Sequence, residues 1–242
     1  MTIASALTAL SQDITAARTA ITTKGGTVTA NGGSSQLATD IATIPSGGSS
    51  GRYQLHDRVK SDSNVDVGMV SGFFLDANNT EYAVVCLNAQ YRLASGVYCS
   101  DKTATITNLP AYTNLTLWSA TETATFNTQK ILDYAASKSA TSTACTHCRN
   151  KYFTVRGTRY YGQLPNIQEL VDIYRSRIFI NNGDPTASSY SSLIVPTNKR
   201  TWSSSQYSIA NAWTANANGA VGADAKTTQY FVIPVLEIPN AV

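Results

Sequence analysis

The sequence predicts an α+β protein in which an N-terminal helix and a linker precede an antiparallel α+β domain. Residues 1–45 contain no Trp, Tyr, Phe or Cys, but their apolar residues recur at helical spacing. Residues 46–51, Ser-Gly-Gly-Ser-Ser-Gly, have the composition of a flexible linker. From Tyr53 onward aromatic residues appear and short strands predominate. Because few strands alternate with helices, an antiparallel α+β arrangement over residues 52–242 is favoured over a doubly wound parallel sheet.

The first helix is predicted from six apolar residues separated by alternating steps of four and three. They are Ile3, Leu7, Leu10, Ile14, Ala17 and Ile21. This spacing is the a/d seam of a coiled coil, and a lone helix of about 30 Å with such a stripe is marginally stable in water. We therefore expect self-association, with dimer and trimer both open from the heptads. The alternative is packing on the chain itself or on a neighbouring protein. Lys24–Gly26 ends the helix, and a shorter helical pattern stops at Pro45.

Strands of the second domain are expected where β-branched and aromatic residues run between turn residues. They are Val67–Leu75, Tyr82–Leu87, Arg92–Cys99, Tyr152–Arg156, Leu193–Val195 and Gln229–Ile238. The turn at 77–80 predicts a hairpin between the first two. One helix is expected within Thr128–Asn150. A second begins after Pro165, where Asn166 and Glu169 have the spacing of a capping box.

Composition argues against several classes of partner. Only 14% of the 242 residues are charged, the net charge is +3, and no Lys/Arg run exceeds two residues. Nucleic-acid binding is therefore not expected, since it needs a basic stripe. The sequence has no apolar run long enough for membrane insertion. It also lacks a basic N-terminal region typical of a secretion signal, so we expect assembly in the cytoplasm.

The cysteines, Cys86, Cys99, Cys145 and Cys148, are too few for a disulfide scaffold, and we expect free, buried thiols. Cys145 and Cys148 are one helical turn apart and are interpreted as a pair of core thiols; a zinc or redox site is the alternative. Zinc takes four ligands, and the sequence has no second Cys-x-x-Cys and no His-x-x-x-His. We expect no metal and no cofactor.

Catalysis is not expected either. The two histidines, His56 and His147, do not accompany a nucleophile motif. Glycosidases need a pair of carboxylates, but the acidic residues form no local signature, and Glu169 is explained as a cap partner. A glycan-degrading enzyme is kept as a minor alternative.

Three segments of the second domain together resemble the C-type-lectin-like domains of bacteria and phages. They are Leu164-Pro165-Asn166-Ile167-Gln168-Glu169-Leu170, Thr201-Trp202-Ser203-Ser204-Ser205, and Asn211-Ala212-Trp213 followed by Val232-Ile233-Pro234-Val235. The resemblance covers roughly residues 120–238 and includes Phe126-Asn127-Thr128 and the Cys145–Arg149 segment. That family includes phage receptor-binding tips and retroelement-diversified variable proteins. The resemblance implies a small twisted antiparallel sheet, two flanking helices, long loops on a binding face, and Trp202 and Trp213 on core strands.

This sequence departs from two relatives of that fold. Formylglycine-type oxidation would need cysteines after the Leu-Pro motif, and none follows Cys148. The calcium-binding motifs of true C-type lectins, Glu-Pro-Asn or Gln-Pro-Asp with Trp-Asn-Asp, do not occur. The resemblance therefore implies recognition without metal.

The N-terminal stretch separately resembles a module repeated in phage structural proteins. The likeness is carried by residues 14–28, Gly32-Gly33 and 37–45, and covers most of residues 3–45. It implies attachment of residues 1–45 to other virion proteins, and the phage fibres it resembles are commonly trimeric.

We therefore expect a homotrimeric fibre or spike subunit of a bacteriophage virion, tail or head, whose lectin-like domain attaches to a host-surface protein or glycan. The segment between residues 181 and 218 is rich in Tyr, Asn and Ser. Tyr offers a large contact area for a ligand, and Asn and Ser offer adaptable hydrogen bonds. The candidate ligand-binding residues are Asp184, Tyr190, Gln206, Tyr207, Asn211, Asn216 and Asn218; the alternative is an ordinary polar loop. Other functions left open are a purely structural head fibre or capsid decoration protein and a surface-displayed variable protein of a cell.

Overall fold

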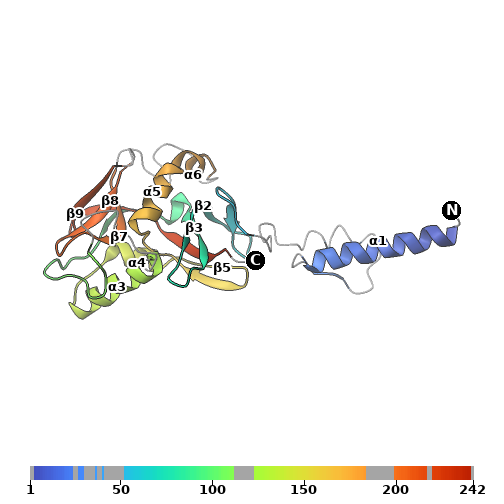
Figure 1. Cartoon of the computed structure of the whole chain (residues 1–242), viewed down its shortest axis with the longest axis horizontal. Helices are drawn as coiled ribbons and strands as arrows, with labels where there is room; N and C mark the ends of the chain where they lie inside the picture. Colours follow the sequence, from blue (N-terminus) through green and yellow to red (C-terminus); the bar gives the residue numbers. More distant parts are fainter. Residues whose placement is uncertain are drawn as a thin grey trace.

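The computed structural model of the chain describes residues 3–23, 27–29, 36, 40, 52–111, 123–183, 199–216 and 220–240. Its helices are α1 (Ile3–Thr23), the 3₁₀ turn η2 (Ala89–Tyr91), α3 (Ala124–Ser137), α4 (Thr143–Arg149), α5 (Ile167–Arg175) and α6 (Arg177–Gly183). Its strands are β1 (Arg58–Lys60), β2 (Asp66–Leu75), β3 (Glu81–Leu87), β4 (Leu93–Val97), β5 (Tyr152–Val155), β6 (Thr158–Tyr161), β7 (Thr201–Gln206), β8 (Asn211–Ala215), β9 (Val221–Ala225), β10 (Gln229–Val232) and β11 (Val235–Pro239). Figure 1 shows their arrangement. The predicted α+β class is confirmed.

Helix α1 ends at Thr23, directly before the predicted stop at Lys24–Gly26. Ile21 is only 3% exposed in the single chain, so the chain itself covers the last position of the heptad seam. Ile14 and Ala17 remain half-buried. The side chains of the first three seam positions and the shorter helix that stops at Pro45 lie outside the described residues.

A four-stranded sheet with the order β1-β2-β3-β11 forms one half of the second domain. β2 and β3 pair as the predicted antiparallel hairpin around the turn at 76–80. Alternation along β3 buries both faces of the sheet: Val84 and Cys86 pack toward α5, while Val85 and Leu87 pack against the other side.

A five-stranded sheet with the order β4-β10-β7-β8-β9 forms the other half. β10 and β7 pair in parallel, unlike the purely antiparallel sheet that was predicted. The segment Gln229–Ile238, predicted as one strand, is two strands in different sheets. The break falls at Pro234, which has no N–H to donate to a strand ladder, although its carbonyl accepts from the N–H of Leu87 (3.0 Å).

The domain also has more helices than predicted. The expected helix within Thr128–Asn150 is two helices, α3 and α4, because Ser139 has a positive φ of 50° and Ser142 then caps α4 by accepting from the N–H of Cys145. α6 was not predicted. The described part of the domain therefore contains four α-helices where two were expected. The predicted strand Leu193–Val195 lies outside the described residues.

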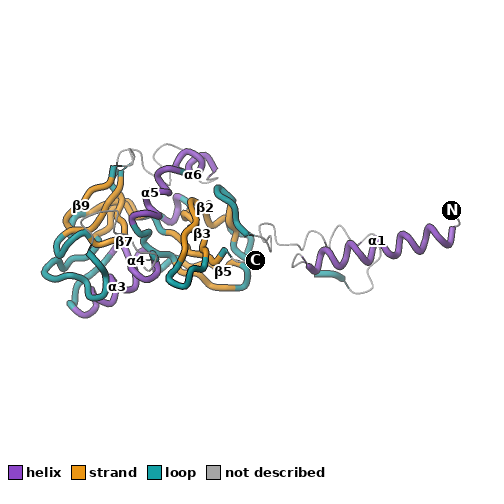
Figure 2. The backbone as a smooth tube through the Cα atoms, in the orientation of Figure 1, coloured by secondary structure: helices purple, strands orange, loops and turns teal. Residues whose placement is uncertain are grey.

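Helix α5 joins the two sheets. Figure 2 shows it between β2 and β3 on one side and β7 and β9 on the other. Its residues Ile167, Leu170 and Ile173 share one core with Trp213 of β8 and Val235 of β11. A second core lies between α3, α4 and the five-stranded sheet, and a third lies between the four-stranded sheet and the β5–β6 hairpin.

The first and last described residues of this domain meet beside the four-stranded sheet. The N–H of Tyr53 donates to Oδ1 of Asn240 (2.6 Å), and the N–H of Asn240 donates to the carbonyl of Glu81 (2.8 Å). Arg52 in turn forms an ion pair with Glu81 (2.6 Å). In Figure 1 this end of the domain lies on the side opposite β8 and β9.

Candidate functional site

The Trp-Ser-Ser-Ser-Gln segment is buried along its whole length, and its serines hold the start of α5. After Trp202 the register with β8 shifts, so Ser203–Ser205 form a bulge. Oγ of Ser205 accepts from the N–H of Ile167 (3.1 Å), and the N–H of Ser204 donates to the carbonyl of Pro165 (2.7 Å). The motif is therefore structural. Trp202 and Trp213 are 0% and 8% exposed, which confirms their predicted core positions.

Asn166 and Glu169 form the predicted capping box at the start of α5. Oδ1 of Asn166 accepts from the N–H of Glu169 (3.0 Å), and Oε2 of Glu169 accepts from the N–H of Asn166 (2.9 Å). Glu169 is also fully buried and accepts from the hydroxyl of Tyr82 (3.1 Å). Burial raises the pKa of Glu169 well above its ordinary value, and the nearby carboxyl of Glu237 raises it further. Glu169 is thus a buried structural acid.

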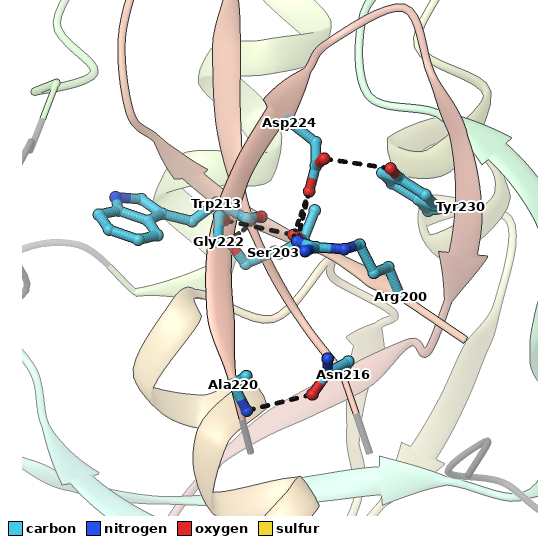
Figure 3. A network of polar contacts seen from close by, with 9 residues as sticks. Arg200, Ser203, Trp213, Asn216, Ala220, Gly222, Asp224 and Tyr230 are labelled. Atoms are coloured by element: carbon cyan, nitrogen blue, oxygen red, sulfur yellow. Dashed lines mark hydrogen bonds and ion pairs between the residues drawn. The ribbon is translucent and has the colours of Figure 1, made fainter. Parts of the chain in front are cut away.

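A polar network ties together β8, β9 and β10 of the five-stranded sheet (Figure 3). Asp224 lies at its centre: Oδ2 accepts from Nη1 of Arg200 (2.7 Å) and from Oγ1 of Thr214 (2.6 Å), while Oδ1 accepts from the hydroxyl of Tyr230 (3.1 Å). Gly222 leaves room for the guanidinium, because a Cβ at that position would lie 2.5 Å from Nη1 of Arg200. Sequence analysis did not identify this network.

The network is reachable from solvent, since the side chains of Arg200 and Asp224 are 39% and 22% exposed. Burial, and next the negative charge of Asp224, raise the pKa of the Tyr230 hydroxyl. Both carboxylate oxygens of Asp224 already accept hydrogen bonds. The arrangement therefore fixes the positions of β8, β9 and β10, and it provides a stiff platform for the turns that leave these strands.

Gln206 was predicted to contact a ligand, but its side chain does not face solvent. It is 0% exposed, and its amide is used inside the domain: Oε1 accepts from Nζ of Lys226 (2.6 Å) and from the N–H of Ile106 (3.1 Å), and Nε2 donates to the carbonyl of Leu109 (2.9 Å). The prediction that Gln206 contacts a ligand is therefore wrong. Lys226, which sequence analysis missed, is equally buried and also donates to the carbonyl of Ile209 (2.7 Å).

Three predicted site residues, Tyr207, Asn211 and Asn216, are half-buried at the ends of β7 and β8. Tyr207 packs edge-on against Trp213, with ring centroids 5.0 Å apart. Oδ1 of Asn216 accepts from the N–H of Ala220 (3.1 Å) and closes the β8–β9 turn (Figure 3). Tyr207 and Asn211 lie near the start of β8 and Asn216 follows its end, so roughly 16 Å of strand separates them. The structure does not gather them into one site.

Asp184, Tyr190 and Asn218, the remaining predicted site residues, lie outside the described residues. In the sequence, Asp184 and Tyr190 fall between α6 and β7, and Asn218 falls between β8 and β9.

The thiols of Cys145 and Cys148 are free and fully buried, as predicted. Burial raises the pKa of Cys145 to about 12 and that of Cys148 well above its ordinary value, so both thiols stay protonated at neutral pH. His147 is turned away from them, and its Nε2 lies 2.6 Å from the carbonyl oxygen of Tyr91. Within the described ranges, no three His, Cys, Asp or Glu side chains are grouped as metal ligands would be.

A hollow of about 570 Å³ lies on the surface between α3 and α4. Its lining includes the apolar residues Leu93, Leu132 and Ala135 and the polar residues His147 and Asn150. His147 is the only titratable side chain among the lining residues, and burial lowers its pKa. Of the helices that the structure describes, none is long and apolar enough to cross a membrane.

No protein-family model matches the chain, and no curated protein matches it. Among solved structures the chain is similar to a fimbrial protein from Bacteroides ovatus, with a TM-score of 0.56 and 13% sequence identity. The similarity covers 77% of this chain and 49% of that protein, so the chain spans about half the length of the structure it matches. At this identity the likeness concerns the fold alone.

Proposed function

We propose that this chain is a non-enzymatic fibre or spike subunit of a bacteriophage virion. Residues 1–45 would oligomerise and attach to other virion proteins, residues 46–51 would act as a linker, and residues 52–242 would form a C-type-lectin-like domain that binds a host-surface protein or glycan. The proposal rests first on the two sequence resemblances, which fall on separate modules and both imply a virion.

One structural observation carries the recognition role: the ends of the domain and the candidate residues Tyr207 and Asn211 lie at different sheets. Tyr53 and Asn240 are joined beside the four-stranded sheet, whereas Tyr207 follows β7 and Asn211 begins β8 in the five-stranded sheet. A domain attached at the first end therefore presents the second end to a partner (Figure 1). Binding residues placed on loops over a rigid sheet are a common arrangement.

Several features support a C-type-lectin-like domain. The two motif tryptophans lie on β7 and β8, the Leu-Pro segment leads into α5, and the chain ends meet at one sheet. The similarity to a fimbrial protein supports an adhesin-like fold. The second sheet and the additional helices extend the arrangement that the resemblance implies.

A trimer through α1 is part of the proposal. Ile14 and Ala17 keep partly exposed surfaces on the heptad seam, which neighbouring copies would cover. Ile21 is already covered by its own chain, so self-association would use the earlier part of the helix.

The proposed contacts with a partner are Asp184, Tyr190, Tyr207, Asn211, Asn216 and Asn218, without Gln206. Tyr207 and Asn211 lie at the start of β8 and Asn216 follows its end, so we propose a broad contact surface and not one pocket. The Asp224 network would hold β8, and with it Asn211 and Asn216 at the two ends of that strand, in a fixed shape, which lowers the conformational cost of binding.

Virion location is tested with antibodies against the purified chain. Phage particles are isolated from lysates of bacteria that carry the gene and examined by immunogold electron microscopy. The proposal expects gold at the ends of fibres or spikes on the particle, and labelling along the capsid would favour the decoration protein instead. Particles that carry no label, in lysates that contain the chain only as free protein, would contradict a virion role.

A further inference from the structure

The β5–β6 hairpin is a rigid two-stranded element outside both main sheets. Its strands pair with Tyr152 opposite Tyr161 and Thr154 opposite Arg159. Its turn is locked by Asp62, whose two carboxylate oxygens accept from the N–H groups of Arg156 (2.8 Å) and Gly157 (2.9 Å). The hairpin therefore presents its side chains in a fixed geometry.

Alternation along the hairpin divides its side chains into two faces. Val155 on the inner face is 1% exposed and belongs to the third core, against which Phe153 and Tyr160 also pack. The outer face carries Tyr152, Thr154, Arg159 and Tyr161. The inner face accounts for the stability of the hairpin, and the outer tyrosines are not needed to fill that core.

The outer tyrosines are unusually open for aromatic residues. Tyr152 is 56% and Tyr161 is 42% exposed, and their ring centroids lie 6.0 Å apart. A guanidinium lies over each ring: that of Arg159 is 4.9 Å from the centroid of Tyr152, and that of Arg149 is 5.2 Å from the centroid of Tyr161. The four side chains thus form one continuous row on the surface, in the order Arg159, Tyr152, Tyr161 and Arg149. We call it the Arg-Tyr row.

The guanidinium groups of this row keep hydrogen-bond donors available. Stacking on a ring uses the face of a guanidinium, whereas its N–H groups point outward in its plane. Arg149 donates one hydrogen bond, to Oε1 of Gln129 (3.1 Å). In the described ranges neither Arg149 nor Arg159 forms an ion pair with a carboxylate; the paired arginines are Arg52, Arg58, Arg175 and Arg200.

We propose that the Arg-Tyr row is a second binding site, which takes a polysaccharide containing carboxylated sugars. A planar guanidinium matches a carboxylate with two parallel hydrogen bonds, and an exposed tyrosine ring offers an apolar contact for the C–H groups of a sugar. The charge of the row is complementary to a uronic or sialic acid. The site shares no residue with the loop surface proposed above and stands on the geometry of the hairpin.

Single-stranded nucleic acid also combines negative charge with flat rings. The observations favour the polysaccharide, because the whole chain carries a net charge of only +3 and no basic stripe that could follow a phosphate backbone. Nucleic acid is therefore treated as an outcome of the test.

The test measures binding of the full chain to immobilised hyaluronan, polygalacturonate and polysialic acid by biolayer interferometry at physiological salt. Carboxyl-reduced hyaluronan, dextran and a deoxythymidine oligomer serve as comparison probes. We expect binding to at least one acidic polymer. We expect a loss of about tenfold in affinity for Arg159→Gln, a larger loss for Arg149→Gln/Arg159→Gln, and a partial loss for Arg159→Lys.

Arg175→Gln is the matched control, because it removes the same charge from an exposed arginine on α5; it should bind as the unmodified chain does. Melting temperatures establish that each variant is folded, and Tyr152→Ala tests the aromatic part of the row. The inference is overturned if no acidic polymer binds, if carboxyl-reduced hyaluronan binds as well as hyaluronan, or if the double variant binds normally. Binding of the oligomer alone, lost in the double variant, would assign the row to nucleic acid instead.

Discussion

The ammonium group of Lys226 donates a hydrogen bond to Oε1 of Gln206 over 2.6 Å, at a place where neither residue is exposed. Burial lowers the pKa of Lys226 from 10.5 to about 8. Between these two values the unfolded chain holds a proton that the folded chain has released. The contribution of Lys226 to stability therefore rises with pH across that window.

This relationship predicts a pH-dependent difference between the unmodified chain and Lys226→Met. Other groups titrate in the same range. The free energy of unfolding of each protein is therefore measured with urea at pH 7.5 and 9.5, and the difference between the unmodified chain and Lys226→Met is compared at the two pH values. We expect the unmodified chain to gain about 2 kcal/mol relative to the variant at the higher pH. A difference that does not change with pH would show that Lys226 titrates normally.

The capping box at α5 predicts unequal costs for its two members. Asn166→Ala removes one cap oxygen and should lower the free energy of unfolding by about 0.5–2 kcal/mol. The spacing alone suggests a smaller cost for Glu169→Ala, but its burial and its hydrogen bond from Tyr82 make us expect the larger cost. The double variant should be non-additive, because the residues form one reciprocal unit. Strictly additive urea-unfolding energies would contradict that coupling.

Glu169 also predicts an acid-range effect. Its pKa in the folded chain lies well above 4.5, so it stabilises the fold at low pH and this contribution is lost as pH rises through the folded pKa. Glu169→Gln keeps the shape without the proton equilibrium. The stability of the unmodified chain relative to this variant should therefore decrease from pH 4 to pH 7 in urea titrations. An increase over that range would mean that Glu169 is stabilised as a carboxylate.

Self-association through α1 is tested at Ile14. In the proposed trimer Ile14→Asp buries an unpaired charge, so light scattering should report a trimer for the unmodified chain and a monomer for the variant. Gln12→Asp adds the same charge at an exposed position of the helix and should remain trimeric. The melting transition of the second domain should stay unchanged in both. A monomeric unmodified chain at micromolar concentration would contradict the proposal.

Much of the local structure could be predicted because its signals are short-range. The end of α1 at Thr23, the β2–β3 hairpin and the capping box at Asn166 each depend on residues within a few positions of one another. The missed strands β1, β6 and β9 are three to five residues long, and too few residues alternate in them to reveal a period.

The candidate site was harder to predict, because its geometry depends on sheet pairing. Arg200 and Asp224 are 24 residues apart and meet because β7 pairs with β8 and β8 pairs with β9. Gln206 resembles an exposed loop residue by composition, yet the bulge in β7 and the pairing with Lys226 place it inside the domain. Composition can indicate that a segment suits binding, but not which of its side chains face solvent.

The recognition surface is tested most directly by cell binding. The fluorescently labelled full chain is incubated with intact cells of a panel of bacterial strains, and the strain that it binds is then used for Tyr190→Ala/Asn211→Ala. Tyr207 is left in place because its ring supports Trp213. Asn78→Ala, at the exposed β2–β3 turn, is the control for loss of a surface amide. We predict that the double variant melts normally but binds the cells about 30-fold more weakly, whereas the control binds normally. Unchanged binding by the folded double variant would contradict it.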